Sequence, residues 1–462
     1  PMVTINIPAM PTMDSHCSII ISMTLSLRSD TVSPKFKVHI TLTRIRALQW
    51  RGGCVAMEDR EWLMDRRFAG MNLGLQRIEL LLQKMDNPQL DFPSIHVAGT
   101  NGKGTLCAFL SSAAANSGLK VGLFTTPHLV VIEERVRIDG EVIDSRTFDE
   151  HLSAVRAAAV EVGKELGEEP TFYECTFAIA MLAFSHAGID RAIIETGLGG
   201  EGDATCLVDA DLCIITTIGL DHTEILGNTR EQIARAKAGI HREGVPMVVY
   251  HPGEESVLET IAEVAGDDLY VHEGIEIDDY WQDWFIFAGY IATSFGWELP
   301  SENINWPGRS PNWPPKDLFK SNIRISAAHN ADGLQSELMS IQEPTILLIG
   351  ITQKANLEDA LADVTSEVWH MPTFRYIIVT EPTSGRNPAV DAEDLADLIF
   401  SNRLDEPKIE RDPTKALEIA EIMSRQAACG ISVMGSVYLV GDLLKFAVER
   451  SDGDLWEHLR VH

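Results

Sequence analysis

A glycine-rich run between an apolar segment and a helical one has the residue types that bind phosphate. It reads Gly99-Thr100-Asn101-Gly102-Lys103-Gly104-Thr105. Backbone N–H groups of such a loop, and the N-terminus of the helix that follows, can surround phosphate oxygens, while Lys103 neutralises their charge and the Thr105 hydroxyl can ligate Mg²⁺. The spacing departs from the standard G-x-x-x-x-G-K-[ST] loop. A glycine-rich turn without a ligand is the alternative.

Three further side chains are candidates for metal or proton chemistry. Glu174 lies near the start of an apolar helix, where burial without a partner is costly, and we expect a metal or a lysine beside it unless the helix dipole alone explains its place. His222 follows a strand that ends at Thr217, and the ends of such strands commonly bind ligands, although a lone histidine is more often an ordinary loop residue with its hydrogen bonds satisfied. Lys237 lies near a helix C-terminus, where spacing alone favours an ordinary lysine of the last turn.

The elements that must position these residues alternate regularly between strand and helix. We predict strands over 94–98, 120–125, 191–195, 212–217 and 246–250, with helices over 105–116, 148–166, 171–187 and 229–238. This alternation favours a largely parallel sheet covered by helices on both faces.

A second, smaller α/β series follows an irregular segment. Between about 266 and 320 tryptophans occur among prolines and glycines, and we place a domain boundary there. Strands at 345–350, 376–380 and 431–434 then alternate with helical patterns at 357–364, 391–400 and 414–426. We predict a poorly structured extension over 1–65, an ATP-binding domain over 66–305 and a Rossmann-like domain over 306–462.

Composition excludes several classes of partner. The 462 residues contain 38 Lys and Arg against 68 Asp and Glu, and a net charge of −30 opposes binding to nucleic acid or to anionic membranes. No apolar run reaches the roughly 20 residues that span a bilayer. Seven scattered cysteines without C-x-x-C spacing indicate neither a disulfide framework nor a zinc site.

We therefore predict a cytoplasmic protein, with a mitochondrial location as the alternative. The alternative depends on residues 1–65, which contain lysines and arginines but no acid between Asp30 and Glu58. A transit peptide would explain this bias, although Asp14 and the loose pattern fit an unstructured leader better.

Seven motifs, taken together and in order, carry a resemblance. The chain from about 71 to 448 resembles the dihydrofolate and folylpolyglutamate synthases of the Mur ligase superfamily, on His96–Gly104, Thr126–Leu129, Glu134–Gly140, Gly197–Gly200, Asp203–Thr205, Gly219–Gly227 and Lys237–Ile240. The resemblance implies a Mur-ligase-like P-loop ATPase domain followed by a Rossmann-like domain.

The resemblance also implies a reaction and a set of site residues. Such a ligase uses ATP to phosphorylate a pterin carboxylate, and the amine of L-glutamate then attacks the acyl phosphate. Lys103, Lys237 and His222 would be catalytic, and residues 99–105 would bind ATP together with Arg309 and Ser326. Thr105, Glu174, His222 and Lys237 would hold two Mg²⁺ ions, with Lys237 carbamylated. We expect a monomer whose partners are ATP, L-glutamate and a pterin, and Asn101 with Asp203–Thr205 favours dihydropteroate over a reduced folate.

Four positions depart from the family pattern. Glu201 and Cys206 replace an arginine and an asparagine beside the expected acceptor pocket, Phe285 stands where an amide is expected, and Ser326 replaces a nucleotide-contacting aspartate. Three hypotheses remain open: a folate-type ligase with altered contacts, which we favour, a ligase with another carboxylate or amine, and a weakened relative that binds nucleotide.

Overall fold

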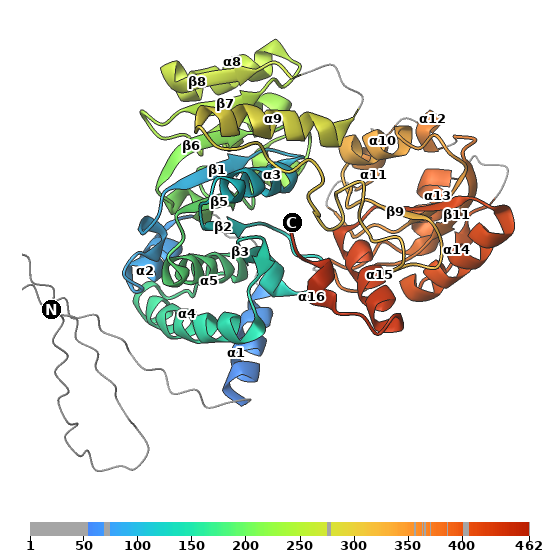
Figure 1. Cartoon of the computed structure of the whole chain (residues 1–462), viewed down its shortest axis with the longest axis horizontal. Helices are drawn as coiled ribbons and strands as arrows, with labels where there is room; N and C mark the ends of the chain where they lie inside the picture. The colour runs from blue at the N-terminus through green and yellow to red at the C-terminus, as the bar shows by residue number, and fades with distance from the viewer. Residues whose placement is uncertain are drawn as a thin grey trace, which may run out of the picture. The chain divides into compact units, whose positions relative to one another are not determined.

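The computed structural model describes residues 54–68, 74–274, 279–354, 357–362, 364, 366–369, 371–385, 387–400 and 406–461 (Figure 1). Most of the predicted N-terminal extension therefore lies outside the described residues. Its last part is more ordered than predicted, because residues 54–65 form the helix α1 (Cys54–Asp65). From Glu58 onward this helix is held by ion pairs, with Asp59 binding Arg156 and Arg60 binding both Glu133 and Asp149.

The first part of the chain contains an eight-stranded sheet, which confirms the predicted mostly parallel arrangement of strands. Its strand order is β4-β3-β2-β5-β1-β6-β7-β8, and only the pairs β2–β3 and β3–β4 are antiparallel. The strands are β1 (Ser94–Ala98), β2 (Val121–Phe124), β3 (Val136–Ile138), β4 (Glu141–Val142), β5 (Arg191–Glu195), β6 (Ala210–Ile215), β7 (Met247–Tyr250) and β8 (Leu269–His272).

Two buried clusters of apolar side chains pack helices against this sheet. One contains side chains of α2 (Gln76–Gln83), α4 (Ser145–Leu166), α5 (Phe172–Ala187), α7 (Arg230–Ala238) and α8 (Glu255–Ala265). The other contains those of α3 (Lys103–Asn116) and α9 (Tyr280–Ser294). Short helical turns complete this part at η1 (Arg66–Phe68), η2 (Pro88–Leu90), η3 (Ile132–Arg135), η4 (Ala204–Leu207), α6 (Thr223–Leu226) and η5 (Gly266–Asp268).

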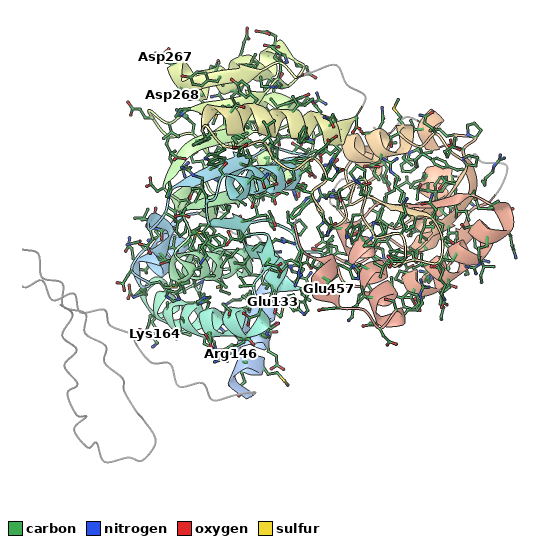
Figure 2. The ribbon with its side chains drawn as sticks, in the orientation of Figure 1. Glu133, Arg146, Lys164, Asp267, Asp268 and Glu457 are labelled. Atoms are coloured by element: carbon green, nitrogen blue, oxygen red, sulfur yellow. The ribbon has the colours of Figure 1, made fainter. Side chains whose placement is uncertain are left out.

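Charged side chains lie on the solvent side of these helices. Arg146 and Lys164, both on α4, extend outward from the ribbon in Figure 2, and each pairs with a glutamate of the same helix. Such exposed pairs contribute little to stability. No helix in the described part of the chain is long and apolar enough to cross a bilayer.

The predicted irregular segment around 266–320 is partly helical. Trp281, Trp284, Ala288 and Ile291 recur at helical spacing on α9 and are buried. They pack on α3, where the rings of Trp281 and Phe109 lie 4.7 Å apart. Two of the tryptophans of this segment, Trp281 and Trp284, therefore belong to the apolar face of a helix.

A second, all-parallel sheet follows, as predicted. Its order is β12-β11-β10-β13-β9, with β9 (Ile323–Ile325), β10 (Thr345–Ile349), β11 (Phe374–Val379), β12 (Lys408–Ile409) and β13 (Gly430–Met434). Its helices are α10 (Ala331–Met339), α11 (Leu357–Ala362), α12 (Ser366–Trp369), α13 (Ala392–Phe400), α14 (Pro413–Ala427), α15 (Val437–Arg450) and α16 (Leu455–His458). Trp306 still belongs to the core of α3 and α9, whereas Trp313 belongs to the core of this second sheet.

Candidate functional site

The glycine-rich loop connects β1 to α3, the position at which parallel sheets bind phosphates. Gly99 and Gly102 both have positive φ, 143° and 86°. A Cβ at Gly99 would lie 1.8 Å from Thr216 Oγ1, and one at Gly102 would lie 2.2 Å from Trp284 Cζ2. Glycine is therefore required at both positions by conformation and by space.

Two side chains of the loop, Lys103 and Thr105, have polar groups that could bind the phosphates of a nucleotide and a cation. Lys103 Nζ donates to the carbonyls of Gly99 at 3.0 Å and Thr100 at 3.1 Å, so its ammonium lies over the loop. The Thr105 hydroxyl is fully buried and has no hydrogen-bond partner among the described residues. A buried hydroxyl without a partner costs free energy, and a cation at the loop would remove that cost.

Lys237 is a buried member of the site and not an ordinary last-turn lysine. Its side chain reaches from α7 to the phosphate loop, where Nζ donates to Gly99 O at 2.7 Å, and only 5% of the residue is exposed. Burial, assisted by the charge of Lys103, lowers the pKa of Lys237 to about 7. A substantial fraction of the amine is therefore uncharged near neutral pH, which is the form that reacts with CO₂.

Glu195 is a site residue that the sequence analysis missed. It ends β5, next to β1, and its Oε2 accepts a hydrogen bond from Thr126 N at 2.9 Å. Burial raises the pKa of Glu195, while Lys103 acts in the opposite direction. The available signal is an acid at the end of an apolar strand, two residues before Gly197, whereas strand periodicity alone accounts only for its place in the strand.

Glu174 requires a correction. Its buried carboxylate pairs with the guanidinium of Arg77 at 3.2 Å and accepts from Thr171 N at 2.6 Å in an N-terminal capping box. The lysine expected beside it is therefore wrong, because an arginine on α2 and the helix N-terminus satisfy the charge. Glu174 does not line the cavity at the phosphate loop, and its role as a metal ligand stays a prediction.

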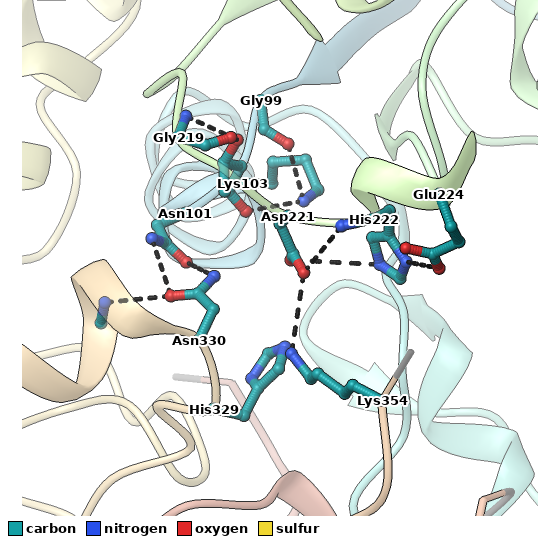
Figure 3. Close-up of polar contacts among 12 residues, drawn as sticks. Gly99, Asn101, Lys103, Gly219, Asp221, His222, Glu224, His329, Asn330 and Lys354 are labelled. Carbon is teal, nitrogen blue, oxygen red and sulfur yellow. Dashed lines mark hydrogen bonds and ion pairs between the residues drawn. The ribbon is translucent and has the colours of Figure 1, made fainter. Parts of the chain in front are cut away.

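His222 lies in a polar cluster with Asp221, Glu224 and Lys354 (Figure 3). Its ring nitrogens lie 4.0 Å from Asp221 Oδ2 and 3.9 Å from Glu224 Oε1, and burial lowers its pKa. Asp221 in turn lies 3.6 Å from Lys354 Nζ. Burial opposes the charged form of Asp221, but Lys354 and His222 outweigh it and hold the pKa of Asp221 below its usual range.

Residues after β9 also reach the phosphate loop. Asn330 and Asn101 exchange side-chain hydrogen bonds of 2.9 Å and 3.3 Å, so each amide donates to the other (Figure 3). Ser326 is buried nearby, but its hydroxyl accepts from Ala328 N at 3.2 Å and it does not line the phosphate-loop cavity. Of the predicted nucleotide-binding residues, Gly99–Gly104 and Arg309 therefore line this cavity, whereas Thr105 and Ser326 do not.

These side chains enclose a cavity of about 120 Å³, which we call the phosphate cavity. It is lined by Gly99, Thr100, Asn101, Gly102, Lys103, Gly104, Thr126, Pro127, Glu195, Gly197, Leu198, Asp221, His222, Lys237, Arg309 and His329. Among the described residues no three His, Cys, Asp or Glu side chains are grouped to hold a metal alone. Mg²⁺ commonly takes one or two carboxylates and completes its shell with phosphates and water, so the donors fit an ion that arrives with a nucleotide.

A larger cavity of about 270 Å³, the acceptor cavity, adjoins the phosphate cavity. Both are lined by Thr126, Pro127, Gly197, Leu198 and His222. The remaining lining residues combine aromatic rings with cations and are Arg66, Arg67, Arg135, Thr171, Phe172, Tyr173, Glu174, Gly202, Asp203, Ala204 and Tyr438. This mixture suits a flat apolar ring system that carries an anionic group.

Arg135 and Asp203 give this cavity its polar character. The Arg135 guanidinium lies 5.2 Å from the Phe172 ring, and burial lowers its pKa to about 10. Asp203 accepts from the Tyr173 hydroxyl at 3.0 Å and from Leu198 N at 2.9 Å. A buried acid and a buried guanidinium on one wall can fix the orientation of a ligand.

Glu201 and Cys206, which depart from the family pattern, do not line the acceptor cavity. Glu201 is exposed to solvent, and Cys206 Sγ lies 2.9 Å from Gly200 O, a carbonyl of its own loop. Neither lines the cavity, so the expected charge reversal beside the acceptor is not present there. Phe285, the other departure, packs its ring 5.8 Å from that of Phe109 in the core of α3 and α9.

Comparison with known proteins agrees with this geometry. Residues 97–251 match the Mur ligase middle domain. The chain is 40% identical over 208 residues to the dihydrofolate synthase/folylpolyglutamate synthase of Haemophilus influenzae, an alignment that covers 44% of this chain and 45% of that relative. This chain is therefore similar to that family, and the alignment spans less than half the length of this relative.

Other relatives extend the similarity over most of the chain. A probable dihydrofolate synthetase of Schizosaccharomyces pombe is 27% identical over 434 residues, covering 81% of this chain and 98% of its own length. The solved Thermotoga maritima folylpolyglutamate synthase has 26% identity and a TM-score of 0.68 over 87% of this chain and 99% of its own. The Escherichia coli FolC complex with DHPP and ADP has 24% identity and a TM-score of 0.71, and the match covers 85% of this chain and 98% of that chain. The two sheets follow each other along the chain as expected for the fold of these solved structures.

Proposed function

We propose that this protein is an ATP-dependent ligase that adds L-glutamate to a pterin carboxylate through an acyl phosphate. The observation that carries the proposal is the wall common to the phosphate and acceptor cavities, made by Thr126, Pro127, Gly197, Leu198 and His222. Because the cavities meet there, the carboxylate of a ligand in one can reach the terminal phosphate of a nucleotide in the other.

Relatives support the substrate classes. The Escherichia coli FolC structure holds DHPP and ADP, and the structure of another relative holds Mn, AMPPNP and L-glutamate. We extend these classes to this chain, with dihydropteroate favoured as acceptor over a reduced folate. We also propose that residues 66–305 form the ATP-binding domain and residues 306–462 the second domain.

The nucleotide would occupy the phosphate cavity. Loop amides and Lys103 would hold its phosphates, and Arg309, which also lines the cavity, would add a second cation. Thr105, Glu195 and His222 would hold a Mg²⁺ ion, and a carbamylated Lys237 would hold a second. A bound Mg²⁺ neutralises charge on the transferred phosphoryl group.

The reaction requires little covalent participation from the protein. An acceptor carboxylate oxygen bonds to the γ-phosphorus and ADP leaves, then the glutamate nitrogen bonds to the acyl carbon, inorganic phosphate leaves and the nitrogen releases a proton. Lys103 neutralises the transferred charge, and the common wall keeps both reacting groups in contact. The phosphate cavity also limits the access of water to the acyl phosphate.

The test is ADP release by the purified protein with Mg·ATP, bicarbonate and L-glutamate. Dihydropteroate, tetrahydrofolate and no acceptor are compared, with Lys103→Ala as the inactive control. Stimulation by one pterin identifies the acceptor. Absence of stimulation by either pterin contradicts the proposal and favours a changed substrate or a nucleotide-binding relative without ligase activity.

A further inference from the structure

His96 is a fully buried residue of β1 to which the mechanism above gives no role. Its ring nitrogen Nε2 lies 2.8 Å from two hydroxyl oxygens, Thr205 Oγ1 and Thr196 Oγ1. Its other nitrogen, Nδ1, lies 3.5 Å from Arg242 Nη1. The ring therefore connects three segments that are far apart in the sequence, and it lines neither the phosphate cavity nor the acceptor cavity.

The Thr205 hydroxyl extends these contacts to Asp203, which lines the acceptor cavity. Thr205 Oγ1 donates to Asp203 Oδ1 at 2.5 Å, and Thr205 N donates to the same oxygen at 3.0 Å. A hydroxyl has one proton to donate, and an ionised carboxylate only accepts hydrogen bonds. Because the proton of Thr205 is directed at Asp203, the Thr205 oxygen can only accept from His96.

Both ends of the His96 ring select the same tautomer. Nε2 must carry the proton in order to donate to Thr205, and Nδ1 must be unprotonated because the Arg242 guanidinium that faces it only donates. The opposite tautomer would place two donors against each other at Arg242 and would leave Thr205 Oγ1 without a donor. Burial, assisted by the charge of Arg242, lowers the pKa of His96 and opposes the doubly protonated ring.

Arg242 is itself held in a fixed position. Its guanidinium donates to Cys206 O at 2.7 Å, to Ile240 O at 2.8 Å and to Val208 O at 3.1 Å. A guanidinium with three carbonyl acceptors has little freedom to turn away from His96. The hydrogen bonds therefore form one chain from Arg242 through His96 and Thr205 to Asp203, which we call the His96 relay.

The His96 relay fills one oxygen of Asp203 and leaves capacity on the other. Oδ1 accepts from Thr205 N, from Thr205 Oγ1 and from the Tyr173 hydroxyl at 3.0 Å. Within the described residues Oδ2 accepts only from Leu198 N, at 2.9 Å. Each carboxylate oxygen has two lone pairs, so Oδ2 can accept one more hydrogen bond from a molecule in the acceptor cavity.

We propose that His96 is a positioning residue: as the Nε2–H tautomer, it keeps the Thr205 hydroxyl on Asp203 Oδ1 and so keeps Asp203 Oδ2 available to the acceptor substrate. The inference rests on the ligase function proposed above, which makes a pterin the occupant of the acceptor cavity. His96 acts through Thr205 and does not touch the substrate. Loss of the relay should therefore weaken binding of the pterin and not of ATP or L-glutamate.

The kinetic test breaks the His96 relay at Thr205. Thr205→Val removes the hydroxyl but keeps the shape of the side chain, and it should raise the KM for the pterin about tenfold or more, the usual effect of losing a hydrogen bond to a charged group. The KM values for ATP and L-glutamate should not change. Thr205→Ser keeps the hydroxyl and should retain the native KM for the pterin.

Thr196→Val is the matched control for the kinetic test. Its Oγ1 lies at the same 2.8 Å from His96 Nε2, but it takes part in none of the hydrogen bonds to Asp203 described above. This variant should leave the KM for the pterin unchanged. An equal rise of that KM in both valine variants, or no rise in Thr205→Val, would overturn the inference.

A spectroscopic measurement tests the tautomer without turnover. In protein with ¹⁵N-labelled histidine, the chemical shifts of the ring nitrogens distinguish the protonated from the unprotonated atom, and the His96 signals are those absent from His96→Gln. Nε2 should carry the proton, and a proton on Nδ1 would show that the relay is wrong. The valine variants keep His96, so the kinetic test stands even if His96→Gln does not fold.

A binding measurement separates this inference from the ligase function. Dihydropteroate is titrated calorimetrically into the ADP-bound native protein and into Thr205→Val. If no pterin stimulates ADP release but Thr205→Val binds dihydropteroate about tenfold more weakly, the ligase function fails and the His96 relay stands. If ligation occurs and Thr205→Val binds dihydropteroate as tightly as the native protein, the relay is wrong and the ligase function stands.

Discussion

Lys237 should make the stability of the folded protein depend on pH in an unusual direction. Its pKa falls from 10.5 to about 7 on folding, because the amine is buried beside Lys103. A base whose pKa is lowered binds fewer protons when folded, so stability rises with pH between the two values. At pH 7 this lysine costs roughly 4 kcal/mol, and raising the pH to 10 should recover about 3 kcal/mol of that cost.

Lys237→Met isolates this effect. The variant removes the buried amine and its 2.7 Å hydrogen bond to Gly99 O, and the latter loss costs about 1 kcal/mol. Near pH 7 the variant should therefore be more stable than the native protein by roughly 2–3 kcal/mol, and the advantage should vanish by pH 10. Ligase activity should be lost at every pH.

The assay is urea denaturation of both proteins from pH 6 to 10 in CO₂-free buffer, which keeps the lysine uncarbamylated. Groups that titrate in the same way in both proteins contribute equally to both unfolding free energies. The difference between the two unfolding free energies therefore reports the titration of Lys237. A difference that stays constant over this range would refute the argument that Lys237 is buried as a neutral amine.

Three further substitutions test the proposed metal ligand Glu195, the buried ion pair of Arg77 and the phosphate loop. Glu195→Gln should lower kcat by roughly a hundredfold or more and weaken its Mg²⁺ dependence in the ADP-release assay, and retained Mg²⁺ dependence would exclude Glu195 as a ligand. Arg77→Met should lower the unfolding free energy by about 3–5 kcal/mol by leaving Glu174 buried without its cation, measured by denaturation, while Arg77→Lys should lose less. Gly102→Ala should raise the KM for ATP, since a Cβ there meets Trp284, and an unchanged KM would show that the loop does not contact the nucleotide.

Local patterns predicted the parts of the site that are close in sequence. The phosphate loop was identified because its glycines and Lys103 lie between a strand and a helix, and both ends of that connection are read from periodicity within a few residues. The mostly parallel first sheet and the second α/β series followed from the same alternation. The resemblance to a family, and not spacing, indicated a role for Lys237.

Partners that are distant in sequence were not predicted. Arg77 and Glu174 are 97 residues apart, and Lys237 and Gly99 are 138 residues apart, so no local pattern connects either pair. Glu195 was overlooked because its role depends on β5 lying next to β1, which is a property of strand order. The helix α9 was missed because its tryptophans occur close to prolines and glycines that belong to the following segment.

The dipeptide Thr126–Pro127 has a consequence for inhibition. A compact molecule bound against it would exclude ligands from the phosphate cavity and the acceptor cavity at once, and it would be competitive toward both the nucleotide and the pterin in the same assay. A substitution that confers resistance at either residue would alter recognition of both substrates together. Escape from such an inhibitor by a single mutation should therefore carry a large loss of catalytic efficiency.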